Sequence, residues 1–183
     1  MRFSGFTPDF SIKVEIMKPS NYRDKDNMAY TRHNYMGGIP GSKIVRFTMG
    51  NTDKNFTHKV ILVNTRSGQI RHNALEAARI AAFRHLETRL ERKNFMLKIV
   101  PFPHQILREH KRVNVAQADR FQEGMKMAYG KPVSRAARLD KRDTLIYAEV
   151  EEDDVEVAKR ALEKASNKLP LPTQMLVEEL EAN

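Results

Sequence analysis

The chain has 183 residues, a formal net charge of +9 and no cysteine. This length is enough for one compact domain with a modest core, and the lack of cysteine excludes disulfides, thiolate metal sites and a cysteine nucleophile. The chain contains no run of 18 apolar residues, and residues 1–6 lack the apolar core of a secretory signal. We therefore expect a cytoplasmic protein without a membrane span.

The charge is distributed unevenly along the chain. Residues 149–183 contain four Lys/Arg and ten Asp/Glu, a net charge of −6, and residues 1–148 contain 28 and 13, a net charge of +15. A body with this surplus should attract a polyanion, because each phosphate that it neutralises releases condensed counterions. The alternative is a solvated basic surface without a specific partner. We expect the acid-rich end to face solvent or a protein neighbour, away from phosphate.

Residues 1–42 contain three prolines and four glycines without a sustained period of 3.6 or 2, which predicts an extended arm. Within this arm tyrosines alternate with basic residues, as in Tyr30-Thr31-Arg32-His33. The mixture suits nucleobases that stack on the rings while guanidinium groups hold phosphates. Tyrosines that simply cover the core explain the pattern equally well.

Two β-rich runs, Lys43–Met49 and His58–Asn64, flank a turn-like stretch and predict two strands. A long helix is expected from near Gln69 to near Arg92, because apolar residues recur there at helical spacing. This stripe consists of Leu75, Ala78, Ala82, Leu86 and Leu90. Arginines beside the stripe can extend to its rim, where they could meet a phosphate.

Further elements follow in the C-terminal half. Phe95–Phe102 predicts a strand that prolines end, and a basic passage at His104–Arg112 leads to a short helix around Asp119–Tyr129, which Gly130 ends. The remaining expected elements are strands at Val133–Leu139 and Thr144–Val150, a helix at Asp154–Asn167 and an edge strand at Thr173–Val177. Together they predict an α+β fold, with about five or six strands in an antiparallel or mixed sheet and two long helices over one face.

No catalytic or metal-binding motif is present. The six histidines form no His-x-x-x-His pair and no HExxH motif, and neither GxxxxGK[ST] nor GxGxxG occurs. The acids Glu151–Asp154 are explained by the start of a helix, whose dipole they complement. We therefore predict a binding protein without a cofactor or metal. A nuclease that uses Asp119, Glu123 and histidines remains an alternative from another class.

Several motifs resemble, in the right order, one family of ribosomal proteins. They include Gly38-Ile39-Pro40-Gly41-Ser42-Lys43-Ile44, Gln69-Ile70-Arg71-His72-Asn73-Ala74-Leu75, Phe102-Pro103-His104-Gln105-Ile106-Leu107-Arg108 and Gly130-Lys131-Pro132-Val133. The chain is similar over roughly residues 17–178 to the archaeal and eukaryotic "ten-e" large-subunit ribosomal proteins, the counterpart of bacterial large-subunit protein sixteen. An archaeal origin is expected.

The resemblance implies a structural role in the large ribosomal subunit. It implies a sandwich fold with a hammerhead-like β motif, and contacts with rRNA between the central protuberance and the base of the acidic stalk. It also implies a position near the elbow and acceptor region of tRNA in the aminoacyl site, neighbouring large-subunit proteins, and late assembly with assembly factors. A free RNA chaperone or translational regulator, not stably bound to the ribosome, is the alternative.

The candidate RNA contacts come from the resemblance and from the charge pattern. Family basic positions are matched by Arg32, Lys43, Arg71, His72, Arg79, His104, Arg108, Arg120, Lys131 and Arg138. The basic and aromatic segments add Arg23, Tyr30, His33, Arg84, Lys111, Arg112 and Arg135. The segment that matches the family's loop toward the tRNAs comprises Glu109, His110, Lys111, Arg112, Val113, Asn114, Val115, Ala116, Gln117 and Ala118.

Two features depart from the family pattern. The stretch Asn114–Arg120 lacks the family's glycines, so this loop should have fewer accessible backbone conformations. The family normally begins near Met17, so residues 1–16 are expected to be an extension or the product of a mis-assigned start. We expect residues 17–42 to form an RNA-binding arm, residues 43–178 a single domain and residues 179–183 an acidic tail.

Overall fold

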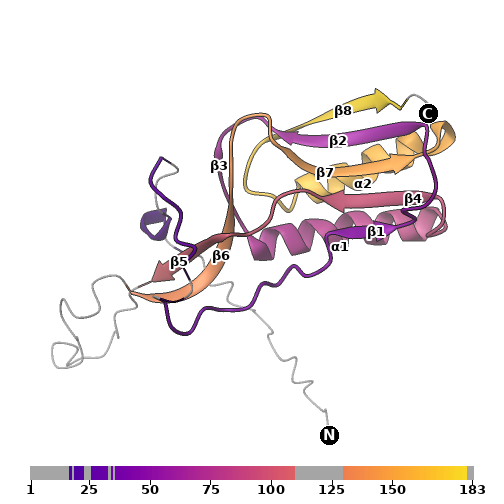
Figure 1. The fold of residues 1–183 in the computed structure, drawn as a ribbon. Helices are drawn as coiled ribbons and strands as arrows, with labels where there is room; N and C mark the ends of the chain where they lie inside the picture. The colour runs from indigo at the N-terminus through magenta and orange to yellow at the C-terminus, as the bar shows by residue number, and fades with distance from the viewer. Residues whose placement is uncertain are drawn as a thin grey trace, which may run out of the picture.

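A computed structural model of the chain describes residues 17, 19–22, 26–32, 34, 36–109 and 130–180 (Figure 1). The possible N-terminal extension and the short helix expected around Asp119–Tyr129 lie outside the described residues.

The larger of two sheets has five antiparallel strands in the order β1-β4-β7-β2-β8. Its strands are β1 (Thr48–Gly50), β4 (Phe95–Ile99), β7 (Thr144–Val150), β2 (His58–Asn64) and β8 (Thr173–Glu179). Ala148 of β7 pairs with Val60 on one side and with Leu97 on the other. Because paired residues share a face, these buried side chains form one continuous apolar surface.

Two helices cover that apolar face, as Figure 1 shows. They are α1 (His72–Arg89) and α2 (Val155–Ser166), which follows a short 3-10 turn, η5 (Glu152–Asp154). The expected stripe on α1 is confirmed: its four members within the helix are fully buried, and Leu90 packs against the core just beyond it. The buried residues of α2 are mostly alanines, such as Ala158 and Ala161. Small side chains allow the two helices to approach each other closely.

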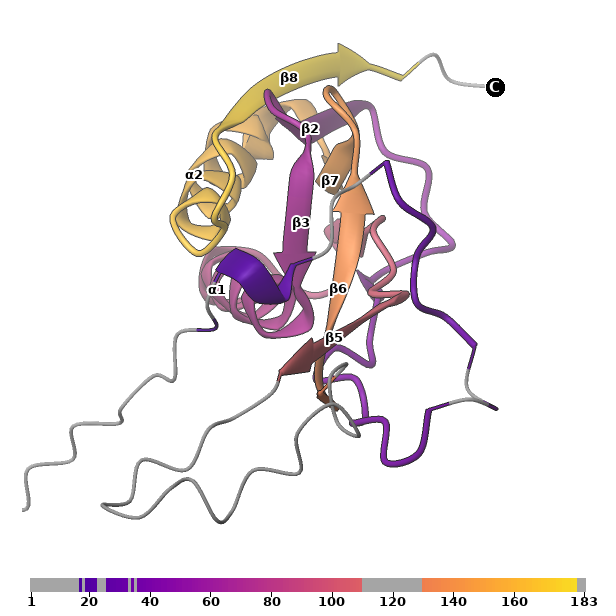
Figure 2. The same cartoon turned by 90° about the vertical axis from the view of Figure 1, so that its left-hand side faces the viewer.

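A second, three-stranded sheet extends from one end of the first (Figure 2). Its order is β3-β6-β5, with β3 (Gly68–Arg71), β6 (Lys131–Leu139) and β5 (Gln105–Glu109), and its pairs are antiparallel. A short 3-10 turn, η1 (Pro19–Asn21), precedes Tyr22, which packs on a small cluster of Met17, Leu107 and Ala136. The chain passes between the two sheets four times: from β2 to β3, from β3 through α1 to β4, from β4 to β5 and from β6 to β7.

Asn64 joins two of these crossings, the one from β2 to β3 and the one from β6 to β7. It is fully buried, and its side-chain nitrogen Nδ2 donates to the carbonyl oxygens of Asp140 at 2.6 Å and Arg66 at 2.9 Å. The backbone of Asn64 also accepts a bond from the N–H of Arg142 at 2.9 Å. Asn64 therefore ties the start of the β2–β3 crossing to the turn between β6 and β7.

The structure corrects the expected elements at four points. The strand expected at Lys43–Met49 is limited to Thr48–Gly50, and the long helix begins three residues later than expected. Gly68–Arg71 forms β3 because it pairs with β6, and the basic passage after His104 contains β5. The described residues thus form eight strands in two antiparallel sheets, which replaces the estimate of five or six and the mixed alternative.

Candidate nucleic-acid interface

The backbone of the arm is attached to β5 by hydrogen bonds at Tyr30. The N–H of Ile106 donates to the carbonyl oxygen of Tyr30 at 3.0 Å, and the N–H of Tyr30 donates to Oε1 of Gln105 at 3.0 Å. Gln105 is fully buried, so its side chain is fixed where it meets the arm. The arm is therefore held by hydrogen bonds beside β5, the edge strand of the three-stranded sheet, at this point.

Two arginines of β6 hold other points of the arm. Nε of Arg135 donates to the carbonyl oxygen of Pro40 at 2.9 Å, and Nη1 of Arg138 donates to the carbonyl oxygen of Asn27. Hydrogen bonds from a charged donor are worth about 1.5–3 kcal/mol each. Both residues were predicted as RNA contacts, and the structure gives each a second task, which is to position the arm.

His72 also supports the arm. It is almost fully buried, and its Nδ1 accepts a hydrogen bond from the N–H of Lys43 at 2.9 Å. Burial, together with the nearby charges of Arg71, Lys43 and Arg135, lowers the pKa of His72. The ring is therefore neutral at pH 7, and this neutral form is the one that can accept at Nδ1. A contact between His72 and RNA stays a prediction.

Two further arginines have partners within the protein. Nε of Arg71 donates to Oγ of Ser134 at 3.3 Å. Two guanidinium nitrogens of Arg79 bind the carboxylate of Glu76 at 2.8 and 2.6 Å, and a third lies 3.0 Å from the sulfur of Met49. Because this carboxylate occupies the fork of Arg79, a bidentate contact with a phosphate would have to replace it.

Exposed cations gather where β5 ends and β6 begins. A hollow of about 590 Å³ is lined by Arg32, Met36 and Arg108, and an adjoining hollow of about 430 Å³ by Met36, Arg108 and Lys131. We call Arg32, Met36, Arg108 and Lys131 the arm-side surface. Arg108 also lies over the ring of Tyr30, 5.9 Å from its centroid. Tyr30 is half-buried, so Arg108 already occupies one face of the ring that could stack on a base.

The charges of the smaller sheet have one sign almost throughout. Its three strands carry Arg71, Arg108, Lys131, Arg135 and Arg138, and their one carboxylate is Glu109. Glu109 pairs with Lys131, so the predicted tRNA-proximal loop leaves β5 beside the arm-side surface. Arg32, Lys43 and Lys131 are exposed and have no side-chain partner among residues 17–109 and 130–180 as far as these are described.

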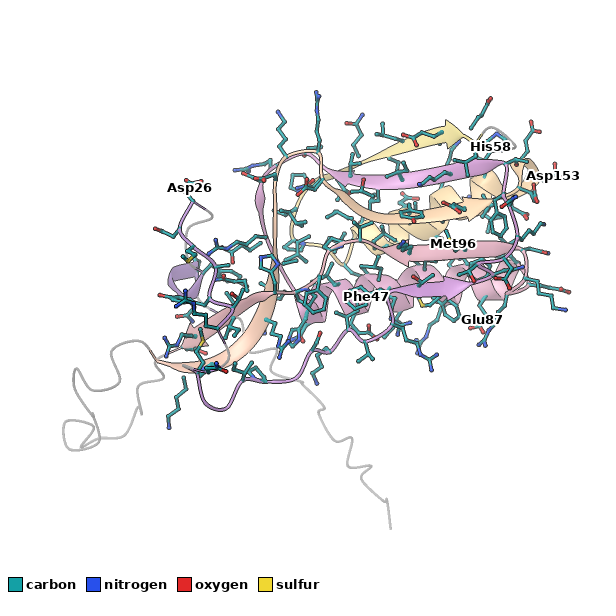
Figure 3. All side chains as sticks on the ribbon, viewed as in Figure 1. Asp26, Phe47, His58, Glu87, Met96 and Asp153 are labelled. Atoms are coloured by element: carbon teal, nitrogen blue, oxygen red, sulfur yellow. The ribbon has the colours of Figure 1, made fainter. Side chains whose placement is uncertain are left out.

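The remaining predicted residues lie elsewhere. His104 is exposed, and its Nδ1 is 3.1 Å from the carbonyl oxygen of Phe102. Arg84 is exposed on α1 and faces the end of α2. Outside the described residues lie Arg23, His33, Lys111, Arg112, Arg120 and the loop residues 110–118. Figure 3 shows Asp26, on the arm, and Asp153, in the acid-rich region, at opposite ends of the molecule.

One group of basic residues was missed. Lys164 of α2 and Lys168 just after it lie beside Arg84 and Arg89 of α1. The net charge of residues 149–183 concealed them, although both lysines line one hollow with the arginines of α1. The prediction that the acid-rich end faces away from phosphate stays a prediction, although α2 itself carries three basic and two acidic residues.

The described part of the chain contains no group of three or more His, Asp or Glu residues that could hold a metal ion. None of its helices has both the length and the apolar character needed to cross a membrane.

Comparison with known proteins identifies relatives over most of the chain. The family model described as ribosomal protein L16p/L10e matches residues 25–176. A protein of Sulfolobus acidocaldarius named large ribosomal subunit protein uL16 is 44% identical over 161 residues, which are 87% of this chain and 92% of the relative. Proteins of the same name are 45% identical in Methanosphaerula palustris, over 89% of this chain and 95% of the relative, and 44% identical in Staphylothermus marinus, over 82% and 87%.

Proposed function

Because the chain belongs to the ribosomal protein L16p/L10e family, we propose that it is a structural constituent of the large ribosomal subunit that clamps rRNA with its arm-side surface. The observation that carries the proposal is a pair of exposed cations, Arg32 on the arm and Lys131 at the start of β6, neither of which has a side-chain partner in the described part of the chain. Family membership agrees with the expectation that the protein is not an enzyme. A place in the ribosome puts it in the cytoplasm.

The clamp works through preorganisation. Arg32 and Lys131 would neutralise phosphates of different RNA segments, and the counterions released would favour binding. Arg135, Arg138 and His72 hold the arm by its backbone, so little conformational entropy remains to be lost when RNA binds. Contacts of this kind read the shape of folded RNA rather than its sequence.

The finer assignment rests on the resemblance. The protein would lie near the aminoacyl-tRNA site and the central protuberance, with residues 109–118 directed toward tRNA, and would join the subunit late in assembly. The geometry that supports this is the pairing of Glu109 with Lys131, which places the end of β5 and the start of β6 at the arm-side surface. The loop would then extend from the rRNA clamp toward a second nucleic acid.

Substitution of exposed cations tests the proposal. Arg32→Gln combined with Lys131→Gln should reduce entry into large subunits on sucrose gradients, and should lower the slope of log K against log salt for rRNA binding by about 1.4–1.8, at about 0.7–0.9 per phosphate contact. The matched control is Lys141→Gln, an exposed lysine beyond the other end of β6. Normal incorporation and an unchanged slope in the double variant would contradict the assignment of these contacts.

A further inference from the structure

A second basic site lies between the two helices, on the side of the helix layer away from the larger sheet. It is a groove of about 570 Å³, and its charged lining is Arg84 and Arg89 from α1 with Lys164 and Lys168 from the end of α2. All four side chains are exposed. We call these four residues the helix groove.

The positive charge of the helix groove is not balanced locally. Within the described ranges, none of its four cations forms an ion pair. Glu87, the carboxylate of α1 nearest in sequence, is bound by Arg92 instead. Glu163 precedes Lys164, and successive residues point about 100° apart around a helix, so its carboxylate is directed away from the lysine. The groove therefore keeps its positive charge.

His85 holds Lys164, one of the two lysines of the groove, in place. Nζ of Lys164 lies 2.9 Å from Nδ1 of His85, and burial, with the charges of Lys164, Arg89 and Arg160, lowers the pKa of this histidine. A neutral ring accepts the hydrogen bond and does not add a charge of the same sign. The ammonium group is thus directed into the groove rather than left to rotate in solvent.

The dipoles of the helices explain only part of this arrangement. Lys164 and Lys168 lie near the end of α2, and Arg89 is the last residue of α1, where cations are favourable. Arg84 lies more than a turn before the end of α1, so its position needs another reason. Positive side chains from two helices meet in the groove and repel one another. This repulsion destabilises the folded protein unless an anion neutralises it.

We propose that the helix groove binds backbone phosphates of rRNA, as a second contact surface separate from the arm-side surface. This inference rests on the proposed function, because rRNA is the polyanion that surrounds a protein of the large ribosomal subunit. In Figure 2 the two helices lie on the left of the molecule and arm residues 26–42 lie on the right, whereas η1, at the start of the arm, lies beside α1. The protein would then hold two RNA segments on opposite sides and keep them at a fixed separation.

The binding experiment compares two double variants in the full-length chain, using protein-free large-subunit rRNA. Arg84→Gln with Lys164→Gln should lower the slope of log K against log salt by about 1.4–1.8, as for two lost phosphate contacts. Arg32→Gln with Lys131→Gln serves as the arm-side comparison and Lys141→Gln as the neutral control. All substituted side chains are exposed, so unchanged thermal unfolding should confirm that each variant is folded.

The outcomes separate the two proposals. The slope of log K against log salt could fall for Arg32→Gln with Lys131→Gln and stay unchanged for Arg84→Gln with Lys164→Gln. This result would overturn the proposal for the helix groove alone and leave the proposed function intact. If the unmodified chain shows no salt-dependent binding to rRNA, both are overturned. A reduced slope for both pairs supports both.

A proximity experiment in assembled subunits adds a direct readout. Because the chain has no cysteine, Thr88→Cys in the groove and Gln174→Cys on β8 each provide one attachment point for a hydroxyl-radical probe. Thr88→Cys should cleave rRNA at a discrete set of nucleotides that Gln174→Cys does not reach. Absence of rRNA cleavage from Thr88→Cys, as expected if an acidic protein occupies the groove, would refute the inference.

Discussion

Replacing Asn64 with alanine should loosen the junction between the two sheets. The side chain is fully buried, and its Nδ2 makes two hydrogen bonds, to the carbonyl oxygens of Asp140 and Arg66. Each bond contributes about 1 kcal/mol, and the vacated space adds to the loss. We expect the free energy of unfolding to fall by about 2–3 kcal/mol, which for a domain of this size corresponds to a decrease in Tm of about 4–12 °C.

Urea denaturation followed by circular dichroism measures this change, with Asn64→Asp as the matched variant. Aspartate has nearly the same shape, but its carboxylate would face two carbonyl oxygens and donate to neither. Its loss of stability should therefore be at least as large as that of alanine. A loss below about 1 kcal/mol for Asn64→Ala, or wild-type stability for Asn64→Asp, would show that this amide does not hold the junction.

Three further predictions concern single residues. Arg79→Gln should lower Tm, because it removes the bonds to Glu76, and should leave the salt dependence of rRNA binding unchanged; a lower slope would instead show a phosphate contact. Stability should fall as pH drops below 6.5, the ordinary pKa of histidine, because burial lowers the pKa of His72 and the unfolded chain takes up the proton first. His72→Asn, which keeps an acceptor for the N–H of Lys43, should flatten thermal unfolding between pH 5 and pH 7, and an unchanged profile would assign the dependence to other groups. Gly50→Ala should destabilise the fold strongly, since φ is +92° and a Cβ would lie 2.1 Å from the carbonyl oxygen of Phe95, whereas Gly41→Ala, with nothing within 4 Å, should unfold like the wild type.

Elements that neighbouring residues in the sequence determine were predicted well, whereas elements that depend on a distant strand were not. The strands at His58–Asn64 and Thr144–Val150 were predicted at the bounds that the structure gives, because they are apolar and end in turn residues. Gln69–Arg71 was assigned to the helix, since only the pairing of β3 with β6, far along the chain, makes this segment a strand. In the expected strand at Lys43–Met49, Val45 is 78% exposed and no sheet partner lies beside it.

The site was predictable as a set of residue types, but not in its internal bonding. Family motifs indicate basic positions, yet Arg135 meets the carbonyl of Pro40 across 95 residues of sequence. Such a contact depends on the tertiary fold and leaves no local pattern. The helix groove was missed for a different reason, because the net charge of residues 149–183 hides Lys164 of α2 and Lys168 just after it.

Retention on large subunits in a high-salt wash tests the central claim most directly. Subunits from cells that produce the native chain are washed in about 0.5 M salt and sedimented, and the protein is then quantified in pellet and supernatant. Purely non-specific phosphate binding is largely lost at this salt concentration. If cations on two sides clamp folded rRNA within the subunit, the protein should stay with the pellet. Its release into the supernatant, while other large-subunit proteins remain bound, would contradict the account and favour a free RNA chaperone or translational regulator.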